Sequence, residues 1–206
     1  MTHKVIGIKY SRGATKQIKD GGPALAPDAV HEMFPNEEWT FVTPDGINFE
    51  EYINKDAMLN YVVMIYWING TDNLSRNMAI VTYDGKVWYP TLYDLDGTFG
   101  INPYGGETTK FIENLEEEYS LLFSRTSTLF KKEIAERYFE LRKDILTIEN
   151  TINKFEGIYN QIPEEYIQKE KEKWNNPNQS DINQVREYLE KRVQYLDEFM
   201  GENLKH

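Results

Sequence analysis

The sequence predicts an α+β domain that is mainly helical, with one small β-hairpin near the middle of the chain. Residues 78–83 and 86–92 are rich in β-branched and aromatic side chains and flank Asp84 and Gly85, a strong signal for a hairpin. From Phe111 onward strand signals vanish and apolar residues recur at helical spacing. With 206 residues, of which 40% are hydrophobic, the chain is long enough for one well-buried domain or two small ones.

The chain divides into two parts that differ in composition and in hydrophobic pattern. Residues 1–47 are rich in glycine and proline turn formers and hold only short apolar patches, so we expect brief strands and loops there. Residues 48–206 carry the longer periodic stretches. We therefore predict a separate N-terminal segment, 1–47, and a main domain, 48–206.

The main domain is expected to begin with a helix. Apolar residues follow the helical period from Phe49 to Ile68, and Asn48 is placed to cap the start. Asn69 and Gly70 tolerate the left-handed conformation that closes a helix. The second half of this stretch is apolar on nearly every side, so we expect it to be buried all round.

Helices are also expected after the hairpin. Apolar residues keep a helical period over 129–148 and again over 182–200. Pro163, followed by two glutamates, marks another helix start, because proline fits the first turn and acids suit the positive end of the helix dipole. Residues 175–180 are predicted to form a loop.

Composition excludes several classes of function. The net charge of −11 would repel DNA or RNA, so we expect no nucleic-acid partner. The absence of cysteine rules out disulfides and thiolate chemistry, and the scattered histidines make no zinc-site spacing. We also expect no membrane span and no signal peptide, because the longest apolar run, 61–68, falls far short of the roughly 20 residues that a bilayer requires.

The segment DLDGT, residues 94–98, holds a pair of aspartates directly after the second strand of the predicted hairpin. Taken alone, it resembles the signature of the haloacid dehalogenase phosphatases, in which the first Asp attacks phosphorus and the second acts as general acid. In that superfamily the motif opens a parallel sheet. Here it lies near mid-chain, after a hairpin and before helices, so its context argues against a phosphatase.

A second set of polar residues lies just before the hairpin. Asp72 and Asn77 have the spacing of a protein-kinase catalytic loop, and Asp94 follows the hairpin. A phosphoryl acceptor needs a carboxylate that orients it and takes its proton, and magnesium ions need hard oxygen ligands. Asp72, Asn73 and Asn77 are also common turn formers, but together with Asp94 and Asp96 they favour a phosphate and metal site.

The run YVVMIYWINGTDNLSRNMAIVTYDGKVWYPTLYDLDGTFG, residues 61–100, resembles the core of the CotH family of atypical protein kinases, known from spore coats. In that family a hydrophobic helix leads into a loop that begins Asp-Asn and ends in Asn, then a short hairpin, then a YDxD or WDxD segment. The stretch VREYLEKRVQYL, residues 185–196, resembles the C-terminal helix of the family.

The resemblance implies a protein-kinase-like C-lobe whose small hairpin carries the metal-binding acids. It also implies binding of Mg²⁺ and ATP, and transfer of the γ-phosphoryl group to Ser or Thr of a protein substrate, such as a spore-coat or surface-assembly protein. We accordingly expect the protein in the cytoplasm or the spore coat.

The resemblance also assigns roles to individual residues. Asp72 would be the catalytic-loop acid, and Asn77 and Asp94 would bind magnesium. Asp96 would hold a second metal ion or its water, and Arg76 would contact a phosphate.

Two departures from ordinary kinases leave an alternative open. Gly70 and Thr71 stand where kinases carry the His-Arg pair before the catalytic Asp, and residues 1–47 show no Gly-rich loop. The chain thus looks mostly like a C-lobe, with 1–47 as a linker or the remnant of an N-lobe. The alternative function is a non-catalytic structural module of a spore-coat, surface or phage tail protein that retains only the metal site.

Overall fold

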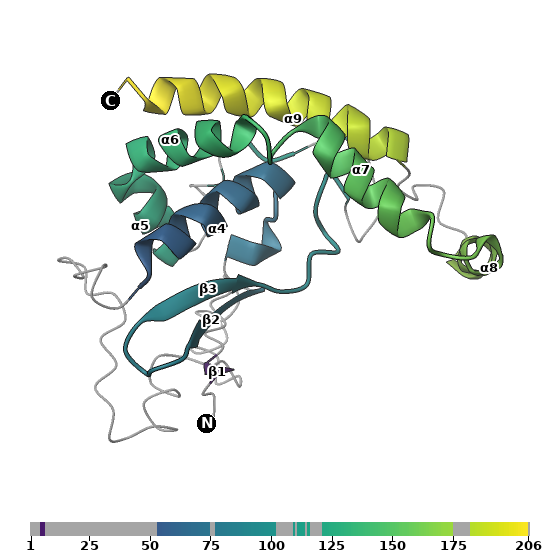
Figure 1. Ribbon diagram of the computed structural model, residues 1–206, viewed down its shortest axis with the longest axis horizontal. Helices are drawn as coiled ribbons and strands as arrows, with labels where there is room; N and C mark the ends of the chain where they lie inside the picture. Colours follow the sequence, from purple (N-terminus) through teal and green to yellow (C-terminus); the bar gives the residue numbers. More distant parts are fainter. Residues whose placement is uncertain are drawn as a thin grey trace, which may run out of the picture.

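The structure is a computed structural model, and it describes residues 5–6, 53–74, 77–101, 109, 111–113, 115, 121–174 and 182–205. These residues form a small sheet and a larger set of helices (Figure 1). The prediction of an α+β, mainly helical chain is confirmed. The division at residue 47 stays a prediction, since only Val5–Ile6 of the N-terminal segment is described.

The predicted hairpin is present and forms most of a three-stranded antiparallel sheet. The strands β1 (Val5–Ile6), β2 (Met78–Thr82) and β3 (Trp88–Leu92) lie in the order β1-β2-β3. Pro90 is compatible with β3 because this strand is at the edge of the sheet.

The connection between β2 and β3 spans residues 83–87 and is organised by Asp84. Its Oδ1 accepts hydrogen bonds from the backbone N–H groups of Lys86 at 2.8 Å and Val87 at 3.0 Å. These bonds lower the pKa of the Asp84 carboxyl. Gly85 takes the left-handed conformation, with φ of 77°, which a residue with a side chain adopts only with strain.

Helix α4 (Lys55–Ile68) begins later than the helical period indicated. The predicted start at Phe49 with Asn48 as cap falls outside the described residues, and in the structure Asn54 is the N-cap, its side chain accepting from Ala57 N at 2.9 Å. Ile53 instead forms an isolated bridge with Trp88 of β3. Pairing with the sheet therefore overrides helical periodicity at this position.

Helix α4 is the central element of the fold. It contacts β3 on one side and helices α5 (Leu121–Leu129), α6 (Lys131–Arg142) and α9 (Ile182–Asn203) on the others. Figure 1 shows α9 and α6 on the side of α4 opposite the hairpin. As predicted, its second half is buried nearly all round, and Asn69 ends it in the left-handed conformation with φ of 52°.

The predicted helical stretch over 129–148 is in fact divided among three helices, since Leu129 is the last residue of α5 and Ile148 is the first residue of a further helix. Helix α6 ends at Arg142 and α7 (Ile148–Tyr159) starts after Thr147, whose side chain accepts from Asn150 N. Ile145, counted as part of the apolar period, lies in the turn between them and is 56% exposed.

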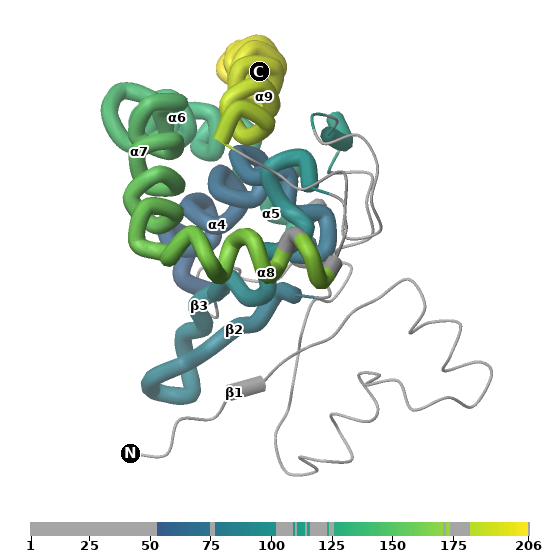
Figure 2. Tube along the Cα trace, turned by 90° about the vertical axis from the view of Figure 1, so that its right-hand side faces the viewer, coloured from purple at the N-terminus to yellow at the C-terminus, as the bar shows by residue number. Residues whose placement is uncertain are grey.

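The start of α8 (Glu164–Trp174) directly after Pro163 is confirmed. Figure 2, turned from the first view, shows α8 in front, leading away from α7. The predicted loop 175–180 lies outside the described residues. No helix within the described part of the chain combines the length and hydropathy needed to cross a membrane.

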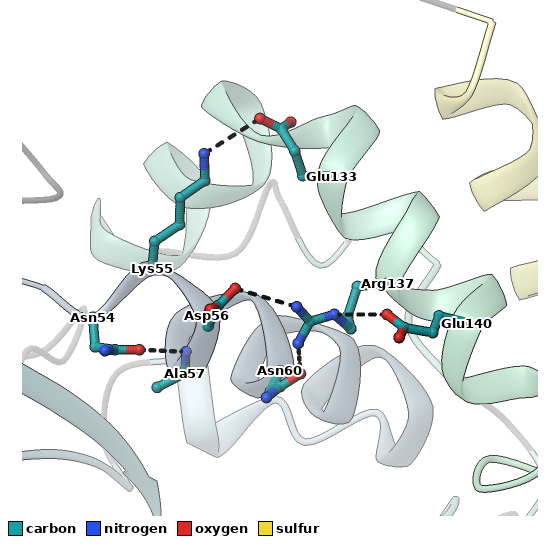
Figure 3. Close-up of polar contacts among 8 residues, drawn as sticks. All are labelled: Asn54, Lys55, Asp56, Ala57, Asn60, Glu133, Arg137 and Glu140. Atoms are coloured by element: carbon teal, nitrogen blue, oxygen red, sulfur yellow. Dashed lines mark hydrogen bonds and ion pairs between the residues drawn. The ribbon is translucent and has the colours of Figure 1, made fainter.

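The N-terminal end of α4 is joined to α6 by polar contacts near the surface (Figure 3). Lys55 Nζ lies 3.5 Å from Glu133 Oε1. Arg137 donates to Asp56 Oδ1 at 3.2 Å and to Asn60 Oδ1 at 2.6 Å. The opposite end of α4 leads into the candidate site.

Candidate functional site

The C-terminal end of α4 is fixed through its last backbone carbonyls, which a helix leaves without intrahelical partners. The carbonyl of Ile65 accepts from the N–H of Asn69. The next three carbonyls accept from α9 or from the segment after β3. The bonds join Tyr66 O to Arg192 Nε at 2.8 Å, Trp67 O to Tyr188 Oη at 3.1 Å, and Ile68 O to Phe99 N at 2.8 Å. The end of α4 is therefore held in place by residues distant in sequence.

The loop 72–77 starts three residues after this anchored end. It opens with one turn of 3-10 helix, η1 (Asp72–Leu74), and is closed by the hydrogen bond from Asn77 N to Asp72 O at 2.8 Å. Tyr61 of α4 donates its hydroxyl to Asn73 O at 2.5 Å. Burial raises the pKa of the Tyr61 hydroxyl, which keeps this donor protonated. A buried hydrogen bond thus fixes the loop to α4.

The same loop is joined to the segment after β3. Asn73 is 1% exposed, and its Nδ2 donates to Tyr93 O at 2.7 Å and, more weakly, to Asn77 O at 3.4 Å. Asn77 Nδ2 in turn donates to Asp94 O at 3.4 Å. The structure therefore brings Asn77 and Asp94 together, although the whole hairpin lies between them in the sequence.

Asn73 is the residue of this region whose importance the sequence analysis missed. It was weighed only as a turn former, yet its amide joins the 72–77 loop to the acid segment. The available signal was its position, directly after Asp72 in a short loop that follows a fully apolar helix end, where a buried polar side chain needs several partners.

Asp94 is held in a backbone conformation that residues with side chains rarely adopt. Its φ is 54°, and Phe99 also has a φ of 54°, in the left-handed region. Such conformations persist where the surrounding contacts determine them, and they cluster at functional sites. Here Thr98 Oγ1 donates to Leu95 O at 2.6 Å, and the Phe99 ring packs edge-on against Phe155 with centroids 5.1 Å apart. Together with the bond from Asn73 to Tyr93 O, these contacts anchor the acid segment on both sides of Asp94.

The side chains of Asp72, Asp94 and Asp96 are exposed. Within the described residues, no three acids or histidines gather closely enough to hold a metal ion by themselves. Magnesium does not require such a cluster, because it is commonly bound through one or two carboxylates together with substrate phosphates and water. The oxygens of Asn77 and Asp94 on adjoining segments fit this kind of site. Arg76 lies outside the described residues.

A comparison with protein-family models matches residues 42–196 to the family described as CotH kinase protein. The chain belongs to this family. The resemblance inferred from residues 61–100 is thereby confirmed, and the match reaches into α9 as far as residue 196. A search of curated proteins found no match to the chain.

The range matched to the CotH family includes all the candidate site residues, at positions 72, 76, 77, 94 and 96. The match does not assign a role to any of them. The roles of Asp72, Asn77, Asp94, Asp96 and Arg76 accordingly stay predictions, to which the structure adds the geometry that joins their two segments.

Proposed function

We propose that this chain is the C-lobe-like part of a CotH-type protein kinase that binds Mg-ATP and transfers the γ-phosphoryl group to a Ser or Thr hydroxyl of a protein. The observation that carries the proposal is the pair of hydrogen bonds from Asn73 and Asn77 to the backbone of Tyr93 and Asp94. These bonds join the loop that carries Asp72 and Asn77 to the segment that carries Asp94. Phosphoryl transfer needs oxygen ligands on both sides of the phosphates.

In the proposed reaction, Asp72 orients the acceptor hydroxyl and takes its proton. The hydroxyl oxygen forms a bond to the γ-phosphorus as the bond from that phosphorus to the β,γ-bridging oxygen breaks, and ADP leaves with the electron pair. Asp72 suits this role because its carboxylate is exposed while its backbone is fixed by the bond from Asn77 N. Positioning and charge stabilisation then supply most of the rate enhancement.

Asn77 and Asp94 are the proposed magnesium ligands, with Asp96 as a further ligand directly or through water. Magnesium bound there would neutralise the negative charge of the phosphates. The left-handed backbone of Asp94 fixes the direction in which its carboxylate leaves the chain. Arg76 is proposed to contact a phosphate. The acceptor is proposed to be a spore-coat or surface-assembly protein, by extension from the family.

Calorimetric titration of Mg-ATP tests the binding step. We expect wild-type protein to bind and Asp94→Asn to lose at least about 10-fold in affinity, because a neutral amide is a poorer magnesium ligand than a carboxylate. Asp84→Asn is the matched control, since Asp84 is an exposed acid of the hairpin loop outside the candidate site. Equal affinity in wild type and Asp94→Asn would refute the proposed role of Asp94.

Transfer of labelled γ-phosphate to a generic protein acceptor tests the chemistry, in the longest natural protein that contains this chain. Magnesium-dependent labelling of Ser or Thr supports the kinase. Binding of Mg-ATP without transfer to any acceptor would instead favour the non-catalytic structural module. A phosphatase would hydrolyse an aryl phosphate with magnesium, and we expect no such hydrolysis because the strand before Asp94 belongs to an antiparallel hairpin.

A further inference from the structure

Helix α9 carries a fully buried arginine that the proposed mechanism does not use. Arg192 is 0% exposed, and within the part of the chain that the structure describes it forms no ion pair with a carboxylate. Its guanidinium lies against the rings of Phe111 and Tyr195, 4.7 and 5.2 Å from their centroids. Burial lowers the pKa of this group. An apolar residue would fill the same space without the desolvation cost of a charge.

The guanidinium joins two segments that are far apart in sequence. Its Nε donates to Tyr66 O in the last turn of α4 at 2.8 Å, and its Nη1 donates to Ile112 O at 3.3 Å. The positive charge also lies at the negative end of the α4 dipole, which is favourable. A planar guanidinium can hold two acceptors at a fixed separation, which an ammonium group cannot do as well.

Ile112 is bound by a second side chain at the same place. Asn69, the residue that ends α4, donates from Nδ2 to Ile112 O at 2.8 Å and accepts from Ile112 N at Oδ1 at 3.0 Å. Asn69 and Arg192 therefore converge on one carbonyl. Tyr195 of α9 adds a bond to the neighbouring Glu113 O at 2.7 Å.

This shared carbonyl lies next to the start of the proposed catalytic loop. Only Gly70 and Thr71 separate Asn69 from Asp72. Any shift of Asn69 would therefore be passed along this short link to the proposed base first, whereas Asn77 and Asp94 lie farther along the chain and are held by further hydrogen bonds, from Asn73 and to each other.

We propose that Asn69 and Arg192 form a clamp on Ile112 that positions Asp72 for phosphoryl transfer, with Arg192 acting as a positioning residue on the C-terminal helix. The proposal rests on the proposed kinase function. It assigns a functional reason to the buried charge and makes α9 part of the catalytic apparatus, although α9 supplies no group that contacts the substrate.

The kinetic test compares Arg192→Met, Arg192→Lys, Asn69→Ala and the double variant Asn69→Ala/Arg192→Met, each assayed well below its melting temperature. We expect Arg192→Met to lower kcat about 10-fold or more while the KM for Mg-ATP changes less than about 3-fold, because the shift reaches the base first and the nucleotide ligands keep their hydrogen bonds to the acid segment. Arg192→Lys retains the positive charge but not the planar guanidinium that holds two acceptors, so it should restore kcat only in part. Since both residues act through one carbonyl, the double variant should lose little more than the worse single variant.

Arg137→Met is the matched control, because Arg137 also joins α4 to another helix but at the opposite end. It should leave kcat unchanged. The proposal would be overturned if the kcat of Arg192→Met equalled that of the wild type, or if Arg192→Met and Arg137→Met changed kcat equally. Either result would leave the kinase function intact.

Amide hydrogen exchange provides a readout that does not depend on activity. The N–H of Ile112, bonded to Asn69, should exchange at least about 10-fold faster in Arg192→Met, because the clamp that protects it opens more often. The N–H of Asn54, bonded to Trp88 O at the opposite end of α4, serves as internal reference and should be unaffected. If the wild type transfers no phosphoryl group, the proposed function fails, and the exchange rate of the Ile112 N–H alone tests whether the clamp exists. An unchanged rate in Arg192→Met would then refute the clamp.

Discussion

The two ends of helix α4 are held by opposite kinds of interaction. At the N-terminal end, Lys55 and Asp56 form ion pairs with α6 (Figure 3), and the Asp56 side chain is 80% exposed. At the C-terminal end, the carbonyls of Tyr66 and Trp67 accept buried hydrogen bonds from α9. Exposed ion pairs contribute little to stability, whereas a buried carbonyl that loses its donor is costly.

The difference agrees with the proposed function, which requires accurate positioning at the C-terminal end of α4. At the N-terminal end, water can solvate the charged groups when they separate, so we expect a small shift against α6 to cost little free energy. The C-terminal end leads through Gly70 into the loop of Asp72, and a buried bond cannot be replaced by water at this depth. Variants at the two ends should therefore differ in activity as well as in stability.

The largest difference is expected for the acids near each end. Asp72→Ala should lower kcat about 100-fold or more, because it removes the proposed general base. Asp56→Ala should leave kcat unchanged. Steady-state phosphoryl transfer by both variants checks this, and equal activity of Asp72→Ala and wild type would refute the role of Asp72.

Gly70→Ala should disturb the loop through its packing. A Cβ at Gly70 would lie 2.8 Å from Asn73 Oδ1, so the amide that bonds to Tyr93 O would have to move. We expect a loss of about 2 kcal/mol in the free energy of unfolding and weaker Mg-ATP binding. Denaturant unfolding and calorimetry measure the two effects.

Gly157→Ala in α7 is the control for this substitution. A Cβ at Gly157 meets no atom within 4 Å, and alanine favours the helix by about 0.5–1 kcal/mol over glycine. The two substitutions should therefore change stability with opposite signs. A stabilised Gly70→Ala would contradict the tight packing at the loop.

Tyr61→Phe tests the buried support beneath the loop. It removes the hydroxyl that donates to Asn73 O and leaves that carbonyl without this donor, so we expect a loss of about 1–2 kcal/mol in the free energy of unfolding. Tyr166→Phe on α8, where the side chain is 54% exposed, should change it by less than about 0.5 kcal/mol. Equal stability of the two variants in denaturant unfolding would argue against the importance of this bond.

Features set by local chemistry could be predicted from the sequence. The stop of α4 at Asn69, the hairpin around Asp84 and Gly85, and the start of α8 after Pro163 each depend on the preferences of one or two neighbouring residues. The start of α4 could not be predicted, because Ile53 pairs with Trp88 of β3, a contact between distant residues.

The same division applies to the candidate site. The spacing of Asp72, Asn77 and Asp94 indicated a meeting of two segments, and the structure brings the last two together. The joining role of Asn73 depends on the backbone of Tyr93, which spacing does not reveal. Arg192 lies on the apolar face of α9, seven residues after Val185 and four before Leu196. Spacing therefore predicts its burial, but the carbonyls that accept from its guanidinium belong to other segments, and spacing does not reveal them.

The smallest effect is expected at the N-terminal end of α4. Arg137→Met removes the contacts with Asp56 and Asn60, and we expect a loss below about 1 kcal/mol because such exposed pairs are screened by solvent. The loss should shrink further in about 1 M salt, where the Debye length falls to roughly 3 Å. Unfolding of wild type and variant at low and high salt measures this. A large loss that salt does not change would mean that the two ends of α4 are held alike, and the contrast between them would then fail.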